Sequence, residues 1–473
     1  MKKHAKEILI FFLIFLVLVF LRLYLLDLRP LHHDEGVHGN FILKLIELGF
    51  YKYNPSYFHG PFLYYASLLG LKIFGPTPLG LRITPVFFGF LTFLLLFFLR
   101  KYYSFLSFVI VCLFYVLSPS ISYYSRSLHH ETFFVFFILA FYVSLIYFLG
   151  EKKPLFLYLA AAFFAFILTE KENFYIVAFI FFSYFFLANK IPFLKGVEKI
   201  NFCEIFKKFR KEIFCSFILF LFIVITLYSN FFKDLSIISD IVIAPFKWFY
   251  IGTSDVQGHN KPFYYFPSLL FKYELPILFF GFLGIIYSLK KRKNLLLSWW
   301  AVLTILIYSL FPYKTPWLII NLTLPLILLS GYGIAIFLKN KTLKIVLALL
   351  LIISFIYLFY QHIQVNFIKY ADPKNDFAYA QTTNDIKWVM EKIKNSGYKK
   401  VAIIGGKSYW PLPFYLYDYN VLYGQLSVFK NLEDYDILIT RKSTKIPAEI
   451  AKKYRAYNFE LRPNVWLKLY IEK

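Results

Sequence analysis

The chain is poor in cysteine and in acidic residues. It has 3 cysteines in 473 residues and no CxxC pair, so neither a disulfide framework nor a thiolate metal site is indicated. Asp and Glu number 27 against 52 Lys and Arg, which gives a net charge of +25. Most basic residues lie between apolar runs rather than on one polar segment, and this distribution argues against nucleic acid as a partner.

Long polar stretches are missing from the first 360 residues. Hydrophobic residues make up 59% of the chain and its mean hydropathy is +0.60, whereas soluble domains are roughly 45–50% apolar. Apolar runs recur from Ile8 to Phe359, and each is long enough to cross a hydrocarbon core of about 30 Å as a helix. The sequence therefore predicts an all-α polytopic membrane protein with about eleven transmembrane helices. We place them near residues 8–26, 83–99, 104–118, 132–149, 155–169, 174–189, 213–231, 274–289, 294–311, 317–338 and 343–360.

Basic clusters separate these spans mostly in pairs, as the positive-inside rule describes. They are Lys2-Lys3-Lys6, Arg100-Lys101, Lys152-Lys153, residues 190–211, residues 290–293 and Lys339-Lys341-Lys344. This pattern predicts a multi-pass protein of the cell membrane with a cytoplasmic N-terminus. An odd number of spans then places the C-terminal segment outside the cytoplasm.

The chain divides into two predicted domains. Residues 1–360 form the transmembrane domain, with long outer loops at 27–82 and 232–270. Apolar residues at helical spacing in the first outer loop predict two interfacial helices, at residues 36–50 and 62–74.

Residues 361–473 are polar and charged, and they are numerous enough to form a domain. A predicted helix at 385–395 and predicted strands at 400–404 and 435–440 indicate a small extracytoplasmic α/β domain. This segment contains no GxGxxG or Walker motif, so these fingerprints indicate no nucleotide site.

An acidic pair flanked by histidines follows the first apolar run. Asp34 and Glu35 come directly after His32 and His33, and His38 lies close behind. Ionisable groups at a membrane boundary are costly to desolvate and usually mark a functional site. Further polar residues map to the same predicted outer face, namely His59, Arg82, Arg126, His129, His130, Glu131, Lys171, Glu172, His259, Lys261, Glu274 and Lys314.

Three short outer turns each keep a single cation against the positive-inside bias, at Arg126, Lys171 and Lys314. Together with Arg82 they are candidates for binding a donor phosphate, although each could instead cap a helix or extend to the membrane interface. Carboxylates beside cations suit a reaction in which a lipid-linked phosphate leaves and a hydroxyl attacks. We therefore predict Asp34 and Glu35 as catalytic residues, with Asp34 as the general base.

The histidines leave two interpretations open. Hydrogen bonding to the substrate is the simpler one, and it gives as candidate substrate-binding residues His33, His59, His129, His130, Glu131, Glu172, His259, Lys261 and Tyr264. A divalent metal ion is the alternative cofactor, with His33, Asp34, Glu35 and His259 as possible ligands. No HExxH motif or other specific metal spacing decides between them.

The order of these motifs resembles the GT-C fold membrane glycosyltransferases of the dolichyl-phosphate-mannose protein mannosyltransferase-like superfamily. Within it, the sequence is most similar to the prokaryotic family of flippase-activity-associated proteins. The segments that carry the resemblance are the Asp34-Glu35 pair, FHGPFLYY (58–65), LGLRITPVFFG (79–89), YYSRSLHHETFFVFF (123–137), LTEKEN (168–173), HNKPFYYFPSLLFKYELP (259–276), YKTPWLIINLTLPLILLSGYG (313–333) and ADPKNDFAYAQTTNDI (371–386).

The resemblance implies a GT-C fold, a polyprenyl-phosphate-linked sugar as donor, transfer on the outer face and Asp34 as base. Two departures bear on the acceptor, which is open between a glycan, a lipid and a protein. Gly60 stands where the superfamily has a proline, and His129-His130-Glu131 replaces a frequent Asp. The competing function is a non-catalytic accessory or transport protein for lipid-linked glycans, in which the same cations would only hold a headgroup.

Overall fold

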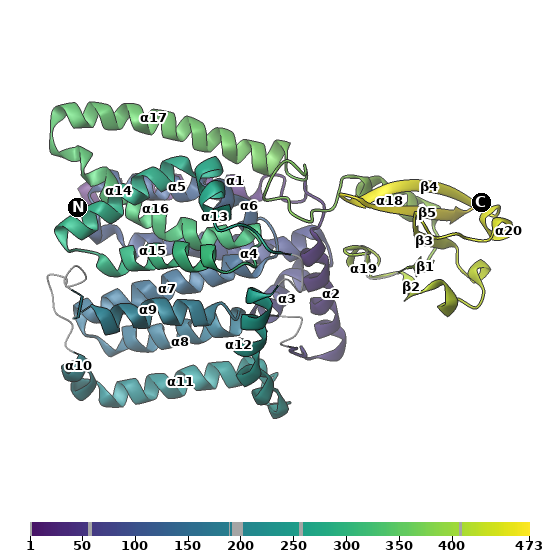
Figure 1. Ribbon diagram of the computed structural model, residues 1–473, viewed down its shortest axis with the longest axis horizontal. Helices are drawn as coiled ribbons and strands as arrows, with labels where there is room; N and C mark the ends of the chain where they lie inside the picture. Colours follow the sequence, from purple (N-terminus) through teal and green to yellow (C-terminus); the bar gives the residue numbers. More distant parts are fainter. Residues whose placement is uncertain (1, 55–58, 189, 192–201, 255–258, 406–408) are drawn as a thin grey trace.

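The computed structural model describes residues 2–54, 59–188, 190–191, 202–254, 259–405 and 409–473. Some residues used in the sequence-based predictions fall outside this set, namely Phe58 of the quoted segment 58–65 and residues 192–201 of the basic segment 190–211. A bundle of long helices forms one part of the molecule, and a small β-sheet domain stands at one end of it (Figure 1).

Each of the predicted spans corresponds to an apolar helix. These helices are α1 (Lys2–Leu23), α4 (Pro78–Phe98), α5 (Phe105–Leu117), α7 (His130–Glu151), α8 (Pro154–Glu170), α9 (Phe174–Leu187), α11 (Arg210–Tyr228), α14 (Leu275–Lys291), α15 (Leu295–Leu310), α16 (Ile319–Ala335) and α17 (Lys341–Ile363). Among the described residues, 6 helices are long and apolar enough to cross a membrane by themselves, or up to 8 if bent pairs count as one span, and one of the six is the segment Leu235–Thr253, which is not among the predicted spans. Four further apolar helices are shorter than 18 residues, so the exact number of spans stays a prediction.

The centre of the bundle is α16. In the apolar stretch that contains this helix, 89% of the residues are buried. Helix α16 packs closely on α14 because small residues line the contact. A Cβ at Gly284 would lie 2.0 Å from the carbonyl oxygen of Leu329, and one at Gly333 would lie 2.1 Å from that of Phe280. Close backbone approach of this kind is how helices associate where lipid removes the hydrophobic driving force.

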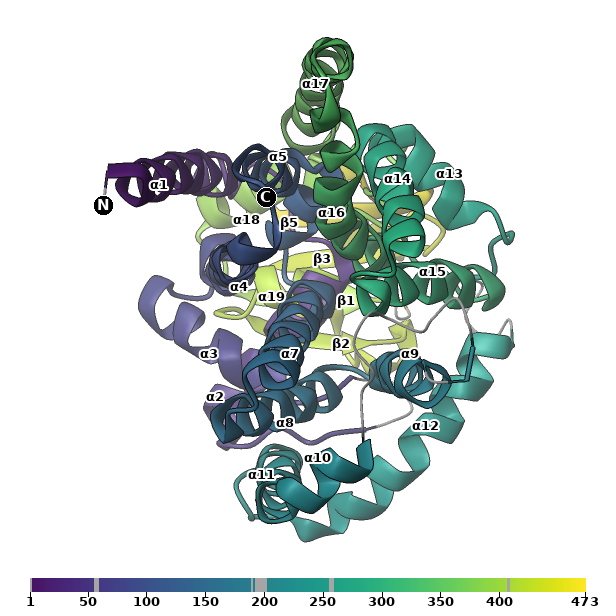
Figure 2. The same ribbon diagram turned by 90° about the vertical axis from the view of Figure 1, so that its left-hand side faces the viewer.

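Three helices lie across one end of the bundle. They are α2 (His33–Leu48), α3 (Phe62–Phe74) and α12 (Ile238–Thr253). Helices α2 and α3 confirm the two helices predicted in the first outer loop. In Figure 1 α12 crosses the bundle end, and in Figure 2, where α7 and α9 are seen end-on, α12 is seen along its length.

The second predicted outer loop, residues 232–270, contains two helices that the sequence analysis did not predict, α12 and most of α13 (Tyr265–Tyr273). The more buried residues of α12 recur every three or four positions, at Ile241, Ala244, Trp248 and Ile251. This spacing is typical of an amphipathic helix that lies on a surface. The end of the bundle that adjoins the sheet domain therefore carries helix α12 as well as α2 and α3.

Residues after α17 lead into the sheet domain. A π-helical turn continues α17 to Ile368, beyond the boundary predicted at residue 360. The predicted helix and both predicted strands are present as α18 (Asp385–Ser396), β1 (Lys400–Ile404) and β3 (Ile437–Arg441). The remaining elements are α19 (Leu412–Tyr415), β2 (Asn420–Gly424), α20 (Ala448–Ala451), β4 (Tyr454–Arg462) and β5 (Val465–Glu472). The strand order is β2-β1-β3-β5-β4, with parallel pairing of β1 to β2 and β3 and antiparallel pairing elsewhere.

The two chain ends lie at opposite ends of the molecule. The N-terminus is at the left end of the bundle in Figure 1, and the sheet domain lies beyond the right end. The connections from α14 to α15 and from α16 to α17, which carry Lys291, Arg292, Lys339 and Lys341, also lie at the left end. The polar residues discussed below gather at the right end, where α2 crosses the bundle.

Candidate functional site

Asp34 lies in the first turn of α2, at the end of the bundle that faces the sheet domain. Two contacts fix this helix start. The imidazole Nδ1 of His32 accepts a hydrogen bond from the Asp34 amide at 3.0 Å, and the Glu35 carboxylate accepts one from the His32 amide at 2.9 Å. Carboxylates are favoured at a helix N-terminus because the macrodipole is positive there. The local sequence therefore places Asp34 in the first turn of a helix whose N-terminus has both reciprocal hydrogen bonds of a capping box.

Glu35 is buried against Arg82 of α4. The Nε and Nη2 groups of Arg82 donate to the two carboxylate oxygens at 2.8 and 2.7 Å, and both side chains are fully buried. The other three N–H groups of Arg82 donate to the carbonyls of Leu26, Arg29 and Pro30. All five donors of the guanidinium are thus used within the protein.

These contacts argue against the predicted phosphate-binding role of Arg82 and the predicted catalytic role of Glu35. Arg82 has no donor left for a phosphate, and Glu35 has no oxygen left for a substrate proton or a metal, because it also accepts from the Leu128 amide at 3.0 Å. Burial works to raise the pKa of Glu35, but Arg82 outweighs burial and holds that pKa below its ordinary value. The pair therefore holds the start of α2 on α4.

The two histidines before Asp34 have defined tautomers. Since His32 Nδ1 accepts from an amide, the proton of this ring is on Nε2, which donates to the Tyr379 carbonyl at 2.6 Å. His33 Nδ1 accepts from Arg462 of the sheet domain, so its proton is also on Nε2, which lies 3.9 Å from an Asp34 oxygen. Burial lowers the pKa of His33 to about 4, and burial also lowers that of His32. Both rings are therefore neutral at neutral pH.

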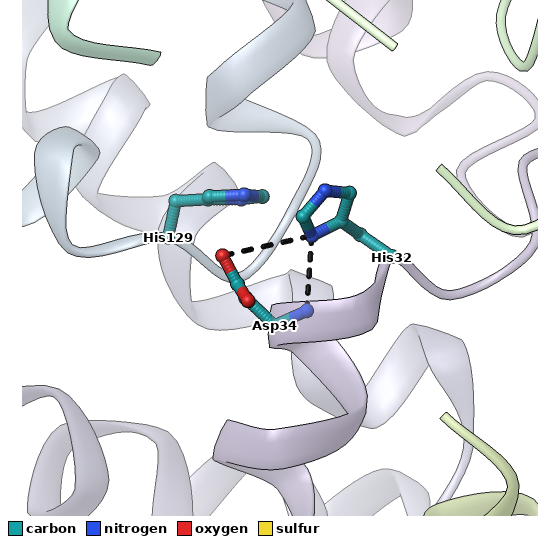
Figure 3. A group of neighbouring side chains, drawn as sticks. All are labelled: His32, Asp34 and His129. Atoms are coloured by element: carbon teal, nitrogen blue, oxygen red, sulfur yellow. Dashed lines mark hydrogen bonds and ion pairs between the residues drawn. The ribbon is translucent and has the colours of Figure 1, made fainter. Parts of the chain in front are cut away.

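The Asp34 carboxylate lies between His32 and the imidazole of His129 (Figure 3). One ligand atom of each of these three residues lies within 4.8 Å of the others. Burial works to raise the pKa of Asp34, but the histidines around it outweigh burial and the pKa lies below its ordinary value. Asp34 is thus ionised at neutral pH, which is the form that a general base or a metal ligand requires.

The group of possible metal ligands differs from the one that the sequence predicts. Among the described residues it consists of His32, Asp34 and His129, rather than His33, Asp34, Glu35 and His259. His33 is occupied by Arg462, Glu35 by Arg82, and the Nδ1 of His259 is 2.8 Å from the Tyr379 hydroxyl. Spacing along the chain could not reveal His129, because about a hundred residues separate it from Asp34 and the fold brings them together.

The imidazole nitrogens and carboxylate oxygens of this group are atom types that bind divalent metal ions. His129 Nε2 is buried without a hydrogen-bond partner among the described residues, and the Asp34 oxygens face it. His32 Nδ1 would have to release the Asp34 amide before it could bind an ion. Two of the three donors are therefore ready, and the third is engaged.

A second polar group continues from Asp34 along the bundle end. His38 packs edge-on against His130 at 5.0 Å between ring centroids, and His130 packs against His59 at 4.9 Å. His130 hydrogen-bonds Glu170 at 2.7 Å, and His59 hydrogen-bonds Glu172 at 2.6 Å. The predicted substrate-binding residues His59, His130 and Glu172 are therefore neighbours in space.

His38 links the two groups electrostatically. Burial lowers its pKa to about 4, with Asp34 raising the value and His59, His32 and Lys171 lowering it. The side chain is thus influenced by both Asp34 and Lys171. It also contacts the Tyr64 hydroxyl through Nδ1 at 3.1 Å.

The three cations of the short outer turns have separate partners. Lys171 forms a buried ion pair with Glu131. Lys314 is buried and donates to the carbonyls of Phe311 and Lys261, and burial lowers its pKa. Arg126 donates to the carbonyls of Leu21, Arg22 and Leu25 at the end of α1.

Arg126 therefore caps a helix, which is the alternative that the sequence left open. The three cations share no partner among the described residues, so the structure gives no support to one common phosphate site. Of these three cations, Lys171 borders a cavity whose lining is described among the placed residues.

This cavity has a volume of about 630 Å³ and lies between α9, α12, α15 and the segment around Trp317. Its walls are mostly apolar and aromatic, and include Phe246, Phe249, Ile251 and Leu318. Its lining also includes His59, Lys171 and Glu172.

Trp317 connects the cavity to Asp34. Its ring lines the cavity and also contacts His32 and His129, at centroid distances of 5.8 and 5.2 Å. The Trp248 ring, on the cavity side, stacks on His59 at 4.5 Å. The arrangement is a mostly apolar pocket that includes a buried cation, and one of its lining residues, Trp317, also contacts two histidines beside Asp34.

The two remaining predicted substrate-binding residues lie nearer to solvent. Lys261 is above the Tyr379 ring at 5.7 Å, and Tyr264 is 66% exposed at the start of α13. Tyr264 makes none of the contacts described for the cluster around Asp34.

Sequence reasoning missed four residues of this region, namely Trp248, Trp317, Tyr379 and Arg462. Trp317 belongs to the quoted segment 313–333 and Tyr379 to the quoted segment 371–386, so the motifs contained a signal for both. The amphipathic spacing of α12 could have indicated Trp248. Nothing in the local sequence distinguishes Arg462, because its position depends on how the sheet domain docks.

Comparison with protein-family models and with curated protein sequences finds no match. Solved structures do match along the chain. ArnT from Cupriavidus metallidurans bound to undecaprenyl phosphate aligns over 98% of this chain and 98% of its own, with a TM-score of 0.68 and 12% identity. Its apo state aligns over 99% and 98%, with a TM-score of 0.69 and 12% identity.

The archaeal oligosaccharyltransferase AglB from Archaeoglobus fulgidus, in complex with an inhibitory peptide and a dolichol-phosphate, also aligns. The match covers 93% of this chain and 70% of AglB, with a TM-score of 0.57 and 14% identity. The GT-C fold expected from the motifs is confirmed, as is the helical membrane architecture with a small C-terminal sheet.

Proposed function

We propose that this GT-C-fold protein is a membrane glycosyltransferase, which moves a sugar from a polyprenyl-phosphate-linked donor to a hydroxyl of an acceptor. The observation that carries the proposal is the cavity of about 630 Å³, whose walls are mostly apolar and include Lys171 together with Trp317. Trp317 also contacts His32 and His129. A polyprenyl-phosphate sugar has the same division between a long apolar chain and a charged head. The ArnT and AglB structures hold undecaprenyl phosphate and dolichol-phosphate, which supports a donor of this class.

The reaction assigned to the site is a substitution at the anomeric carbon of the donor sugar. The acceptor oxygen forms a bond to that carbon, and the bond from the carbon to the phosphate oxygen breaks. Its electron pair leaves with the polyprenyl phosphate. The acceptor hydroxyl gives its proton to the Asp34 carboxylate, which is ionised and lies at the helix start.

The leaving phosphate needs its developing charge met in a partly desolvated place. Lys171 fits this role because it is buried, borders the cavity and is paired with a single carboxylate, Glu131. The ion pair holds the ammonium group in position before the donor binds. Preorganised charge of this kind lowers the barrier without reorganisation during the reaction.

The acceptor would approach Asp34 beside the neutral ring of His129, whose Nε2 has no partner among the described residues. A hydroxyl-bearing acceptor could hydrogen-bond to this nitrogen. Screening of glycan, lipid and protein acceptors distinguishes the three acceptor classes.

A divalent metal would be held by Asp34 and His129 with His32, and it would act as a Lewis acid on oxygens of the substrate. An ion bound to Asp34 would also withdraw the carboxylate from its role as a base. If Asp34 is a general base, added metal should inhibit transfer. If Asp34 is a metal ligand, removal of the metal should abolish transfer, so an experiment can separate the two roles.

We further propose that transfer takes place on the outer side of the membrane. The basic connections of the bundle gather at the end that carries the N-terminus, and Asp34 lies at the opposite end with the sheet domain. The positive-inside rule assigns the first end to the cytoplasm.

The decisive experiment uses the purified full-length protein in detergent or liposomes. It is incubated with a panel of polyprenyl-phosphate sugars and with glycan, lipid and peptide acceptors, and release of polyprenyl phosphate is measured. Release that needs both an acceptor and an intact Asp34 supports the proposal. Absence of release with every donor, from protein that still binds the donor, would favour a non-catalytic role with lipid-linked glycans.

A further inference from the structure

The sheet domain docks directly on the segment that carries Asp34. The Tyr415 hydroxyl accepts a hydrogen bond from the Leu31 amide at 2.9 Å. Two glycines of α2 face the domain, and a Cβ at Gly36 would lie 2.3 Å from the Pro411 Cβ. A Cβ at Gly39 would lie 2.5 Å from the ring of Phe414. The two glycines thus let the sheet domain pack directly on the backbone of α2, and a larger side chain at either position would collide with the domain.

Arg462 extends from this domain to the site. It is the last residue of β4, and the register between β4 and β5 is irregular from Glu460 to Arg462. The turn that follows contains Asn464 with a φ of 66°. This local geometry ends the regular pairing at Arg462, whose Nη1 contacts His33 Nδ1.

The contact has one possible direction. A guanidinium has only donors and keeps its charge, so His33 Nδ1 must be the acceptor. The hydrogen bond made at one imidazole nitrogen decides where the ring proton resides. His33 therefore carries its proton on Nε2, the nitrogen that lies 3.9 Å from the Asp34 carboxylate. The other tautomer would turn a lone pair toward a negative charge.

We propose that Arg462 is a positioning residue of the active site, which fixes the His33 ring so that its Nε2–H faces Asp34. The sheet domain then contributes Arg462 to the catalytic site that the membrane domain carries. This inference rests on the proposed function, because it assumes that Asp34 takes part in transfer. Arg462 acts through His33 and does not itself need to touch the substrate.

Arg462→Met tests the inference, because it removes every donor and keeps an apolar stem. We expect kcat of the full-length protein to fall by about 10²-fold, the loss typical of a misplaced catalytic group. The donor KM should stay within about twofold, since the donor is proposed to bind in the cavity on the other side of Trp317. Arg462→Lys should restore part of kcat, because an ammonium can also donate to His33.

Arg455→Met is the matched control, since Arg455 is the other arginine of β4 and is exposed. It should leave kcat, KM and thermal unfolding in detergent unchanged. If Arg462→Met unfolds early, His33→Gln decides, because this variant keeps Arg462 in place. A loss of kcat in His33→Gln at constant donor KM supports the inference, and wild-type kcat overturns it.

The outcomes separate the two proposals. Wild-type kcat in well-folded Arg462→Met, measured beside an active wild-type protein, overturns the role of Arg462 alone. A wild-type protein that transfers nothing overturns the proposed function and this inference together. Equal losses in Arg462→Met and Arg455→Met would also overturn it, because they would show a general effect on the sheet.

Discussion

Glu35 accepts two hydrogen bonds from Arg82, at 2.8 and 2.7 Å, whereas the described partners of Asp34, one residue earlier, are imidazole nitrogens 3.9 Å away. The two carboxylates of one sequence pair therefore have different environments. Glu35 is buried and saturated with donors, while Asp34 keeps its oxygens available. Unequal environments are how neighbouring acids take separate roles, one structural and one chemical.

Asp34→Asn should abolish transfer and leave folding and donor binding nearly intact. The amide has the same shape but cannot take a proton as a base, and loss of a placed base typically lowers the rate by about 10²–10⁴. The measurement is single-turnover release of polyprenyl phosphate, together with donor binding and thermal unfolding. Wild-type turnover in this variant would exclude Asp34 as the base.

Glu35→Gln should mainly lower stability. Breaking a buried ion pair on one side leaves the other charge uncompensated, which typically costs about 3–5 kcal/mol of unfolding free energy. Unfolding in detergent measures the loss. Glu433→Gln is the control, because its pair with Lys453 is exposed and exposed pairs contribute little. A stable Glu35→Gln with reduced turnover would instead mean that Glu35 acts in catalysis.

Much of the fold could be predicted because membrane helices follow from the length and polarity of apolar runs. Every predicted span has a helix, and α18, β1 and β3 lie where the residue pattern predicted them. The missed helix α12 shows the limit of that reasoning. Its apolar residues follow a helical period, but its position after a span and among polar residues favoured a loop.

The site was predictable at the level of residue type and face, and less so at the level of role. Asp34, His59, His129, His130 and Lys171 do gather at one end of the bundle. The sequence could not distinguish Arg82, whose five N–H groups are all used within the protein, from Lys171, which borders a cavity. Such partners are carbonyls and carboxylates of distant segments, and local sequence does not show them.

Lys171 and Arg126 should respond differently to substitution. Lys171→Met, combined with Glu131→Gln so that no buried charge is left unpaired, should raise the donor KM by about 10-fold or more, because hydrogen bonds to charged groups contribute roughly 1.5–3 kcal/mol. Arg126→Gln should lower thermal stability and leave the donor KM unchanged, since Arg126 caps α1. Steady-state kinetics with varied donor concentration separates these effects. A large rise of donor KM in Arg126→Gln alone would restore the phosphate-binding role that the sequence suggested.

Metal removal should leave transfer unchanged. The His32 Nδ1 is engaged by the Asp34 amide, so the unliganded site is arranged for a base rather than for an ion. Added zinc should inhibit by occupying Asp34 and His129, and His129→Gln should raise the inhibitory concentration at least about tenfold, because loss of even a residue that orients a ligand typically lowers metal affinity by about 10–100-fold. The assay compares chelator-treated protein with and without zinc. Loss of transfer in chelator that zinc restores would establish a metal cofactor instead.

The sheet domain should be accessible from outside intact cells. Its position opposite the basic end of the bundle predicts this, because Lys and Arg are retained on the cytoplasmic side. In a variant whose 3 native cysteines are replaced, Asn420→Cys on the exposed edge strand β2 should react with a membrane-impermeant maleimide before permeabilisation. Lys293→Cys, in the exposed connection between α14 and α15, should react only afterwards. The reverse pattern would place Asp34 on the cytoplasmic side, and transfer would then use donors of the inner leaflet.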